Sequence, residues 1–402
     1  MTPRIIVIGK NYSTPLGVVR SLGKAGYDVD VVYISGSGSI QSTDSVVTAS
    51  KYVGRRLVVE GKDDEIIISS LINDYATESN LCVLFPTDDY SASLIDCYRE
   101  KLEQRFWMPH LVSGSVVEMM DKTRQSKLAC ESGFQVPQEW IVSLDQKDLS
   151  IPPDIVFPCF IKPLLSAKGG KSELSRCDSI QELENKLLRM QERMRERSVL
   201  IQQYLDIDQE YTIGGVCNDQ EVYIPSVIKK QIVAQHYRGI TLSGTMVANK
   251  ELGDLYPIII AFLRNLRFVG MFDIEVHHTN NGFYFGEMNF RCGGPSYSYF
   301  RCGVNLPLLA VKVICGEDIN TDSIKISLGQ TFLNNKVAWE DFAYLFLSYS
   351  ELKRLYHDSD FSLLSDDEDL DPERIFEKKL KPQYLKKHIK NRIKKVLRDG
   401  WH

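Results

Sequence analysis

Two carboxylates and an amide in the segment 268–291 are spaced so that they could bind a metal ion. Apolar and aromatic residues alternate on both sides of Asn281-Gly282, and Asn-Gly is the strongest short signal for a β-hairpin. On this hairpin Glu275 would lie across from Glu287 and Asn289, on one face. Carboxylate and amide oxygens suit Mg²⁺, which proteins usually bind together with substrate phosphates. The hairpin therefore predicts a metal and phosphate site.

Asp273 and Arg291 extend this candidate site. Asp273 shares a strand face with Glu275 and competes with it as a metal ligand, whereas Arg291 lies one strand step beyond Asn289. The planar guanidinium of Arg291 could bind a phosphate or a carboxylate. An exposed acidic face is the alternative, but the other face of the hairpin is strongly apolar, which favours burial. Its apolar residues are Phe272, Ile274, Val276, Phe283, Phe285, Met288 and Phe290.

The segment 157–177 contains a second group of candidate residues. Its CFIKP run is an apolar strand that includes Lys162, and a lysine inside a buried strand needs an anionic partner. The SAKGGKS loop that follows could place backbone N–H groups over phosphates, although glycines are also ordinary in hairpin turns. It lacks the spacing of a Walker loop, which excludes a P-loop nucleotidase. Its candidate residues are Ser166, Lys168, Gly169 and Gly170.

The composition excludes several classes of protein. The 402 residues carry a net charge of -5, which argues against a general nucleic-acid binder. No uninterrupted apolar run approaches the roughly 20 residues that span a bilayer, and the first residues do not resemble a signal peptide. Nine cysteines without a C-x-x-C pair point to the reducing cytoplasm rather than to a disulfide framework or a zinc knuckle.

Strands and helices must position these groups, and the first hundred residues predict an α/β arrangement. Residues 4–34 alternate as strand, loop, helix and strand, which is a βαβ unit of a parallel sheet. A helix at about 63–78, a buried strand at 81–87 and another helix continue the pattern. The glycines of the first turn are too far apart for a dinucleotide fingerprint, so a dehydrogenase has little support.

The middle of the chain predicts a helix that begins after Asp121, with Lys122 at its entry, and a charged helix at about 179–198. Two strands follow, joined by a short bend, and Glu210 on the second strand could accept hydrogen bonds from a ribose. The bend could bind a planar base, but the residues alone do not decide this. Its residues are Gln202, Gln203, Tyr204 and Leu205.

Taken in order, these segments resemble the ATP-grasp superfamily of carboxylate–amine ligases. MMDK is followed by FIKP with SAKGGKS, by IQQYLDIDQEYTI and by FDIEV with FGEMNFR, over roughly residues 1–320. The resemblance implies an α/β fold, in which a parallel N-terminal domain at 1–115 precedes a two-lobed ATP-grasp module. The small lobe would cover 116–200, the large lobe 201–320, and a C-terminal extension 321–402.

The resemblance also implies cofactors and residue roles. The cofactors would be ATP and Mg²⁺, which Mn²⁺ can replace. Lys122 and Lys162 would bind ATP phosphates, and the stretch 166–172 would be the glycine loop that closes over the β- and γ-phosphates. Glu210 would bind the ribose. The adenine would lie at Gln202, Gln203, Tyr204 and Leu205, where many members have an acidic residue and a lysine in place of the two glutamines. The metal ligands would be Glu275, Glu287 and Asn289.

The implied reaction begins when a carboxylate attacks the γ-phosphate of ATP, after which an amine displaces phosphate from the acyl-phosphate. Arg291 and Lys162 would act near the reacting groups. Arg238, on a basic segment, would hold the substrate carboxylate unless it is an ordinary surface arginine. Tyr297 and Arg301 are weaker candidates for the acceptor side.

The substrates would be a small-molecule carboxylate and an amine, and relatives are often homodimers. Phrases such as LGVVRSLGKAGYDV and LFPTDDYSASLI are most similar to a bacterial group that contains D-aspartate ligase and other amino-acid ligases. A cell-wall or nucleotide-linked precursor could then be the acceptor. The carbamoyl-phosphate synthase large chain shares the architecture only. A carboxyphosphate-forming enzyme and a catalytically silent ATP-binding regulator remain as alternatives. The acid and the amine cannot be identified, because substrate residues lie on variable loops.

The last segment falls outside the resemblance. Residues 360–373 predict an acidic linker, and residues 378–402 predict a basic helix. Two interpretations of this helix stay open: it docks on its own protein, or it lies on an anionic membrane surface, which would make a cytoplasmic enzyme membrane-associated. Its apolar residues at helical spacing are Leu385, Ile389, Ile393 and Val396.

Overall fold

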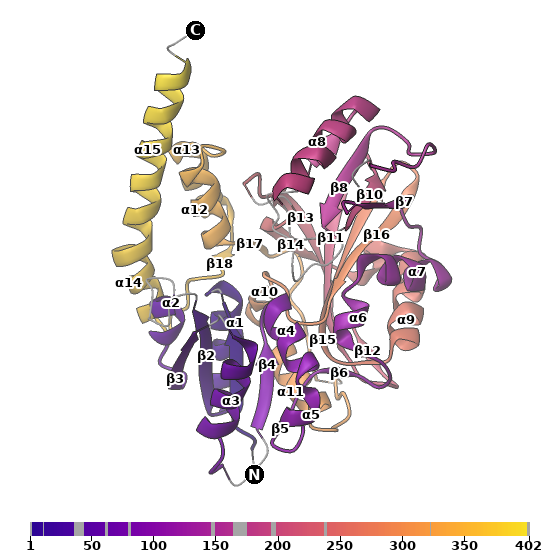
Figure 1. The fold of residues 1–402 in the computed structure, drawn as a ribbon. Helices are drawn as coiled ribbons and strands as arrows, with labels where there is room; N and C mark the ends of the chain where they lie inside the picture. The colour runs from indigo at the N-terminus through magenta and orange to yellow at the C-terminus, as the bar shows by residue number, and fades with distance from the viewer. Residues whose placement is uncertain are drawn as a thin grey trace.

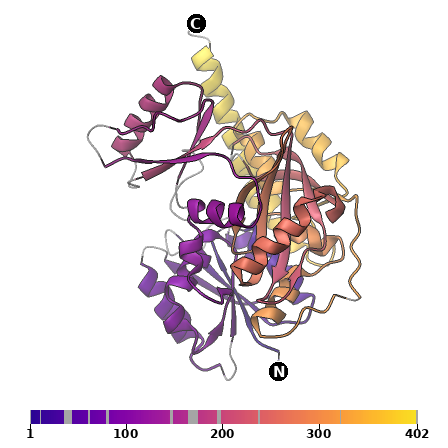
Figure 2. The same cartoon turned by 90° about the vertical axis from the view of Figure 1, so that its right-hand side faces the viewer.

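Three β-sheets and the helices around them form the described part of the chain (Figure 1). In Figure 2 the four-stranded sheet stands at the upper left, above the first sheet and beside the large one. The α/β class is confirmed. The computed structural model describes residues 2–10, 12–35, 44–60, 63–78, 82–145, 149–163, 175–193, 198–236, 239–321 and 323–399.

The first sheet is parallel, with the strand order β3-β2-β1-β4-β5. All residues of β1 and β2 are buried, so both faces are covered, and apolar runs such as IIVIG suit this position. The predicted βαβ unit is confirmed. The strands are β1 (Ile5–Gly9), β2 (Val29–Ser35), β3 (Val53–Glu60), β4 (Cys82–Pro86) and β5 (Phe106–Trp107). The helices are α1 (Ser13–Gly23), α2 (Asp44–Thr48), α3 (Asp64–Asp74), α4 (Asp89–Cys97) and α5 (Arg99–Leu102).

The second sheet is antiparallel, with the order β7-β10-β8-β9. Ile161 packs with Leu183 and Leu187 of α8, and because side chains alternate along a strand, Lys162 lies on the face away from that helix. Its strands are β7 (Glu139–Ser143), β8 (Cys159–Pro163), β9 (Ser175–Cys177) and β10 (Ser198–Gln203). Helix α8 (Ile180–Arg193) packs on this sheet, whereas α6 (Val116–Met119) contacts α4, and α7 (Lys122–Glu131) contacts β16 (Gly282–Asn289) of the third sheet.

The third and largest sheet has the order β16-β15-β11-β13-β14-β17-β18, with β12 on β11 and β6 on β15. Its strands are β6 (His110–Leu111), β11 (Gln209–Cys217), β12 (Val222–Tyr223), β13 (Val227–Val233), β14 (Thr241–Val247), β15 (Phe268–Thr279), β16 (Gly282–Asn289), β17 (Thr331–Leu333) and β18 (Phe361–Ser362). Its helices are η2 (Asn249–Leu252), α9 (Leu255–Leu266), α10 (Tyr297–Arg301) and α11 (Leu306–Ile314).

The predicted hairpin is confirmed as β15 and β16. Its register pairs Glu275 with Glu287 and then shifts, so that Val276 pairs with Phe285 and Gly286 is the extra residue of a bulge. A Cβ atom on Gly286 would lie 2.8 Å from the carbonyl oxygen of Glu275, so the bulge favours glycine. The extra residue also explains how apolar residues on both sides of it join one core with α9. They are Phe283, Phe285, Met288 and Phe290.

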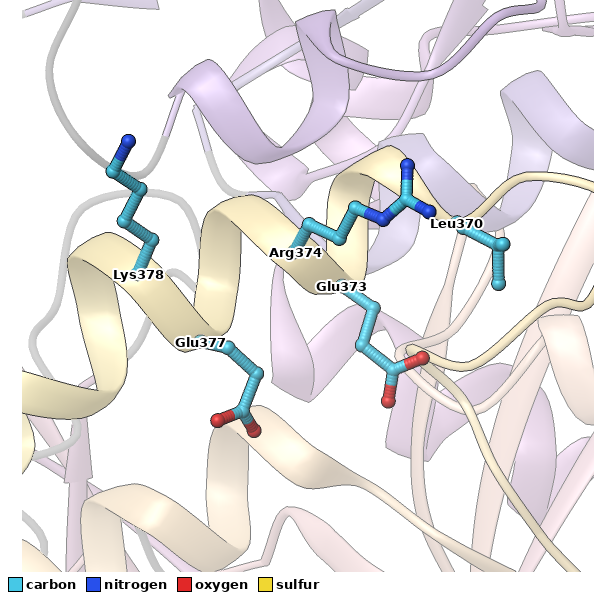
Figure 3. A pocket seen from close by; sticks show the side chains of 5 residues that line it. All are labelled: Leu370, Glu373, Arg374, Glu377 and Lys378. Atoms are coloured by element: carbon cyan, nitrogen blue, oxygen red, sulfur yellow. The ribbon is translucent and has the colours of Figure 1, made fainter.

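Two strands of the C-terminal segment, β17 and β18, belong to the third sheet. The domain limits at 115, 200 and 320 stay predictions. Four residues of α14 and η3, together with the residue that precedes α14, border an open hollow (Figure 3). They are Leu370, Glu373, Arg374, Glu377 and Lys378. The helices here are α12 (Asn335–Ala343), α13 (Tyr349–Asp358), α14 (Asp371–Ile375), η3 (Phe376–Leu380) and α15 (Lys381–Asp399).

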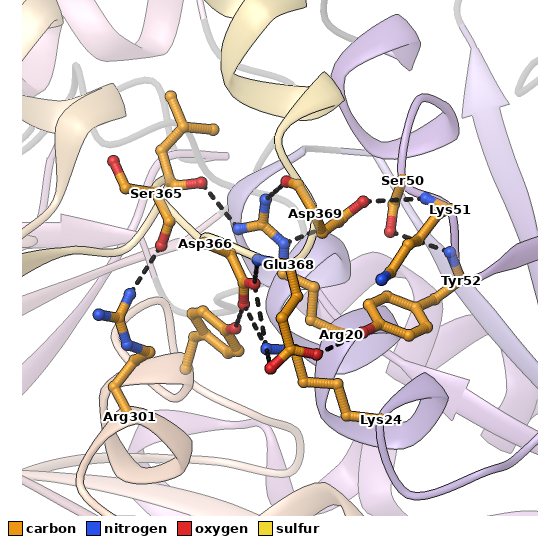
Figure 4. Close-up of polar contacts among 12 residues, drawn as sticks. Arg20, Lys24, Ser50, Lys51, Tyr52, Arg301, Ser365, Asp366, Glu368 and Asp369 are labelled. Atoms are coloured by element: carbon orange, nitrogen blue, oxygen red, sulfur yellow. Dashed lines mark hydrogen bonds and ion pairs between the residues drawn. The ribbon is translucent and has the colours of Figure 1, made fainter.

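The prediction of an acidic linker at 360–373 is wrong, because two of its aspartates are buried ion-pair partners (Figure 4). Asp369 accepts from Nε of Arg20 at 2.9 Å, and Lys24 Nζ lies 3.0 Å from Asp366. Tyr297 also donates its hydroxyl to Asp366. Charge along the sequence could not reveal this arrangement, since the cations are about 340 residues away.

We expect Arg20→Met to lower the free energy of unfolding by about 3 kcal/mol, because it leaves the buried Asp369 carboxylate without its cation. Denaturant unfolding of the full chain measures this change. Arg374→Met is the control, since the Arg374 side chain is exposed and its pair with Asp371 should contribute less than about 1 kcal/mol. Equal effects of the two substitutions would contradict the expectation.

Candidate active site

The hairpin brings two carboxylates and two lysines together. Glu275 and Glu287 are register partners, on the face opposite the apolar core. Nζ of Lys122, at the first turn of α7, lies 3.7 Å from the Glu287 carboxylate, and Nζ of Lys230, from β13, lies 3.4 Å from Glu275. Side chains from three separate elements therefore form one cluster of alternating charge, which could bind a metal ion and phosphates.

Lys230 is a central residue that the sequence analysis missed. Its side chain is fully buried, and Nζ donates to Glu210 at 2.9 Å and to the carbonyl oxygen of Gly239 at 2.8 Å. Burial opposes its charge, but Glu275 and Glu210 outweigh this effect and raise the pKa of Lys230. Lys230 thus links the predicted ribose ligand to a predicted metal ligand. The VIKKQIV run has the same signal as CFIKP, a lysine within an apolar strand.

Lys162 of β8 faces the same site from the second sheet. It donates to the side-chain oxygen of Gln202, whose amide group donates to Glu139 at 2.7 Å. Burial and the nearby Lys122 ammonium lower the pKa of Lys162 to about 8, although Glu287 opposes the shift. Lys162 is therefore a cation that is poorly neutralised in the free protein, and an added anion would stabilise its charge.

The predicted adenine hinge connects the second and third sheets. Gln203 at the end of β10 donates its backbone N–H to Gln138, and Tyr204 donates to the carbonyl of Pro158. The guanidinium of Arg176 lies 4.4 Å from the ring centre of Tyr204, and Leu205 is half-buried beside it. These bonds fix the backbone of the bend at the edge of the site.

Asp273 and Asn289 are register partners next to the two glutamates, and both are buried. Asn289 donates to Asp273 at 3.4 Å and accepts from Arg291 at 3.1 Å, while Nε of Arg291 donates to Asp89 at 2.8 Å. Burial and neighbouring Glu275 raise the pKa of Asp273 to about 7. The choice between Asp273 and Glu275 as the metal ligand stays a prediction.

Arg291 is held by a residue that the analysis of the sequence did not connect with it. Asp89 begins helix α4, which packs against the first sheet, and lies 202 residues earlier in the chain. Burial opposes the charge of Arg291, but Asp89 raises the pKa of the guanidinium. The arginine is thus fixed at the boundary between the first sheet and the hairpin.

Four predicted ligands of the glycine loop lie outside the described residues, and so does Arg238. The four are Ser166, Lys168, Gly169 and Gly170. Tyr297 and Arg301, the weaker candidates for the acceptor side, both contact the segment 360–373. Tyr297 is buried against Asp366, and Arg301 donates to the carbonyl oxygen of Ser365 at 2.7 Å. Both fasten the 360–373 segment to α10.

Glu275, Glu287 and Asn289 form a donor set that suits Mg²⁺, which needs only one or two carboxylates beside substrate phosphates. Within the described ranges, no three His, Cys, Asp or Glu residues gather as a complete metal cage. A site of this type therefore depends on the bound nucleotide for its remaining oxygens.

His277 of β15 has an unsatisfied polar atom on the site face. It pairs in register with Glu210 of β11, two positions beyond Glu275. Its Nδ1 atom is buried and accepts or donates no hydrogen bond within the described part of the chain. Burial lowers the pKa of His277 to about 4, so the ring is neutral at pH 7. A buried ring nitrogen without a partner is unusual in a folded protein and marks His277 as a residue that needs an explanation.

Solved structures share this arrangement of sheets and helices. An L-amino acid ligase from Bacillus licheniformis superposes with a TM-score of 0.59 at 14% identity, over 82% of this chain and 78% of that one. A biotin carboxylase from Campylobacter jejuni superposes with a TM-score of 0.63 at 17% identity, over 82% of this chain and 74% of that one. An N5-carboxyaminoimidazole synthetase from Staphylococcus aureus superposes with a TM-score of 0.62 at 14% identity, over 87% of this chain and 86% of that one.

The chain has the ATP-grasp fold. No protein-family profile matches the sequence. No curated protein matches it either. At identities of 14–17% the structural likeness establishes the ATP-grasp fold and leaves the reaction to be argued from the residues. The predicted resemblance is thus confirmed for the fold.

The affinity for ATP should fall as the pH rises through 8, because Lys162 loses its charge near that pH. The contribution of Lys162 to stability depends on pH in the opposite direction. Between about pH 8 and the usual value of 10.5, the unfolded chain keeps this proton and the folded chain does not, so this residue's contribution to stability rises with pH. Nucleotide titrations between pH 7 and 9 measure the affinity. Lys162→Arg, which stays charged, should flatten the pH profile.

Proposed function

We propose that this protein is an ATP- and Mg²⁺-dependent ligase that joins a carboxylate to an amine through an acyl-phosphate. One observation carries the proposal: Lys122, Lys162 and Lys230 converge from three elements on the Glu275 and Glu287 pair. This is the charge pattern needed to hold a metal ion and a polyphosphate together. Structures with the same fold include complexes with ADP and with β-γ-ATP, which is consistent with a nucleotide at this cluster.

Each residue of the cluster has a role in this proposal. Glu275, Glu287 and Asn289 provide oxygen ligands for Mg²⁺, which when bound neutralises phosphate charge. Lys122 and Lys162 bind phosphate oxygens, and Lys162 recovers its full charge as they approach. The glycine loop, with Ser166, Lys168, Gly169 and Gly170, would cover the phosphates.

Arg291 would stabilise negative charge that develops between the γ-phosphate and the attacking carboxylate. Its fixed position, bonded to Asp89 and Asn289, avoids reorganisation during the reaction. Arg238 would hold the carboxylate substrate. Little covalent chemistry is required of the protein, since alignment and shielding from water account for most of the rate.

Glu210 and His277 are proposed to bind the nucleoside. Replacing His277 with Leu removes the buried unsatisfied nitrogen. The free energy of unfolding of the nucleotide-free protein should therefore stay the same or rise by up to about 1 kcal/mol. The affinity for ATP should nevertheless fall, because a ligand partner is lost. Thermal or chemical unfolding and nucleotide titration measure the two quantities. If stability and affinity both decreased, His277 would have a structural role only.

The substrate is proposed to be an amino acid, in keeping with the resemblance to amino-acid ligases and the fold shared with an L-amino acid ligase. A carboxyphosphate-forming enzyme is the second candidate, because a biotin carboxylase and an N5-carboxyaminoimidazole synthetase share the fold equally well. The amine, the cell-wall or nucleotide-linked precursor and a homodimeric state remain further proposals.

The decisive experiment measures ADP and phosphate release from Mg-ATP with a panel of D- and L-amino acids, each with and without amine acceptors, and separately with bicarbonate. Release that depends on one amino acid would establish the ligase and identify its acid. Release that depends on bicarbonate alone would favour the carboxyphosphate former. Nucleotide binding without release under any condition would favour the silent regulator.

A further inference from the structure

Helix α15 carries a stripe of exposed apolar side chains along most of its length. Ile389, Ile393 and Val396 are 57%, 55% and 64% exposed, whereas large apolar side chains elsewhere are mostly buried. The complete stripe is Leu385, Ile389, Ile393, Val396 and Leu397. These positions recur every three or four residues, so they share one face of the helix. Of the two interpretations left open by the sequence, docking of this stripe on its own protein is not what the described residues show.

The helix docks through its opposite face instead. The ring of His388 stacks on Phe342 of α12 at a centroid distance of 4.0 Å, and its Nδ1 lies 2.7 Å from the carbonyl oxygen of that residue. Asn391 donates to the carbonyl oxygen of Ala343 at 2.9 Å, and Tyr384 stacks on Trp339. The polar and aromatic contacts therefore hold α15 with its apolar stripe turned outward. In Figure 1 the far end of α15 extends past α12 and α13.

The charge of α15 identifies what could cover the stripe. The helix contains eight lysines and arginines and one acid, in a chain whose net charge is -5. Lys386, Lys390 and Lys394 follow one edge of the stripe, and all three are exposed. Within the described residues, no helix is long and apolar enough to cross a membrane. The combination is that of a helix which lies on a surface with an apolar layer beneath anionic groups.

We propose that α15 binds the surface of an anionic lipid bilayer. The stripe would enter the boundary between headgroups and acyl chains, while the flanking cations contact acidic headgroups. A nucleic acid carries negative charge that could bind the cations, but it has no apolar layer that could cover the stripe. A second copy of the chain offers an apolar stripe but brings two rows of lysines together, which repel. Of these three partners, the bilayer is the one that offers both properties, and this binding does not depend on the proposed reaction.

Co-sedimentation of the full chain with vesicles tests the proposal. We expect binding to phosphatidylcholine vesicles with about one third phosphatidylserine, weak binding to phosphatidylcholine alone, and release by salt. Ile389→Glu should reduce the partition coefficient about tenfold or more, because it replaces one buried apolar side chain with a charge. Ile66→Glu is the matched control, since Ile66 on α3 is also 57% exposed.

The proposal would be overturned by no binding of the wild-type chain to acidic vesicles, by equal loss with Ile66→Glu, or by wild-type binding of Ile389→Glu. A dimer that dissociates on Ile389→Glu, without any vesicle binding, would assign the stripe to contact between copies and would also overturn it. Replacement of Lys386 and Lys390 with glutamine provides a second test that leaves the stripe intact. It should weaken binding to acidic vesicles and reduce its dependence on salt.

Discussion

Lys230→Met is expected to lower the free energy of unfolding by about 3 kcal/mol and to abolish detectable binding of Mg-ATP. The Lys230 ammonium lies 2.9 Å from Glu210 and 3.4 Å from Glu275, and its side chain is fully buried. Without it, two carboxylates would face each other where a polyphosphate must enter. Like charges would then repel each other and the nucleotide.

Chemical denaturation and calorimetric titration with Mg-ATP measure the two effects. Lys229→Met is a close control, because the same change is made one residue earlier on β13, at a side chain that is only half-buried and faces away from the cluster. If Lys230→Met bound nucleotide as the wild type does, the central position given to Lys230 would be wrong.

Glu287→Gln is expected to reduce ATP turnover by about 10²-fold or more while leaving the fold intact. The substitution keeps the shape of the side chain and removes one negative charge from the predicted metal site. Stability should change by less than about 1 kcal/mol, because the pair with Lys122 is long, at 3.7 Å, and partly exposed.

Turnover of Glu287→Gln should be measured over a range of Mg²⁺ concentrations, with the substrate found by the panel. A weakened metal ligand raises the Mg²⁺ concentration needed for half-maximal rate, whereas a purely structural residue leaves it unchanged. Glu184→Gln, on the exposed face of α8, is the matched control and should behave as the wild type. Full activity of Glu287→Gln would remove the metal role.

Local patterns in the sequence were sufficient for the hairpin and for Lys162. Alternation and an Asn-Gly turn identified β15 and β16, and an apolar run identified β8. The bulge was also encoded, because the apolar positions change parity between Phe285 and Met288. Lys230 could not be identified in this way because it follows another lysine, and the sequence does not show which of two adjacent lysines is buried.

Contacts between distant segments could not be predicted from these patterns. The pair formed by Asp89 and Arg291 joins two sheets, and neither residue has a local signal for the other. Asp366 is buried because it contacts Lys24 and Tyr297, whereas its acidic sequence neighbours predicted an exposed linker. His277 is similar, since its unsatisfied nitrogen is a property of the assembled site.

The ion pair between Arg20 and Asp369 has a consequence for synthesis of the chain. Its two residues are 349 positions apart, and at about 5–20 residues per second a ribosome needs roughly 20–70 s to translate that interval. During this time Arg20 lacks its carboxylate partner, and the apolar core that α1 shares with Leu363 and Leu364 is incomplete. A chain that ends before Asp369 would therefore lack the buried ion pair.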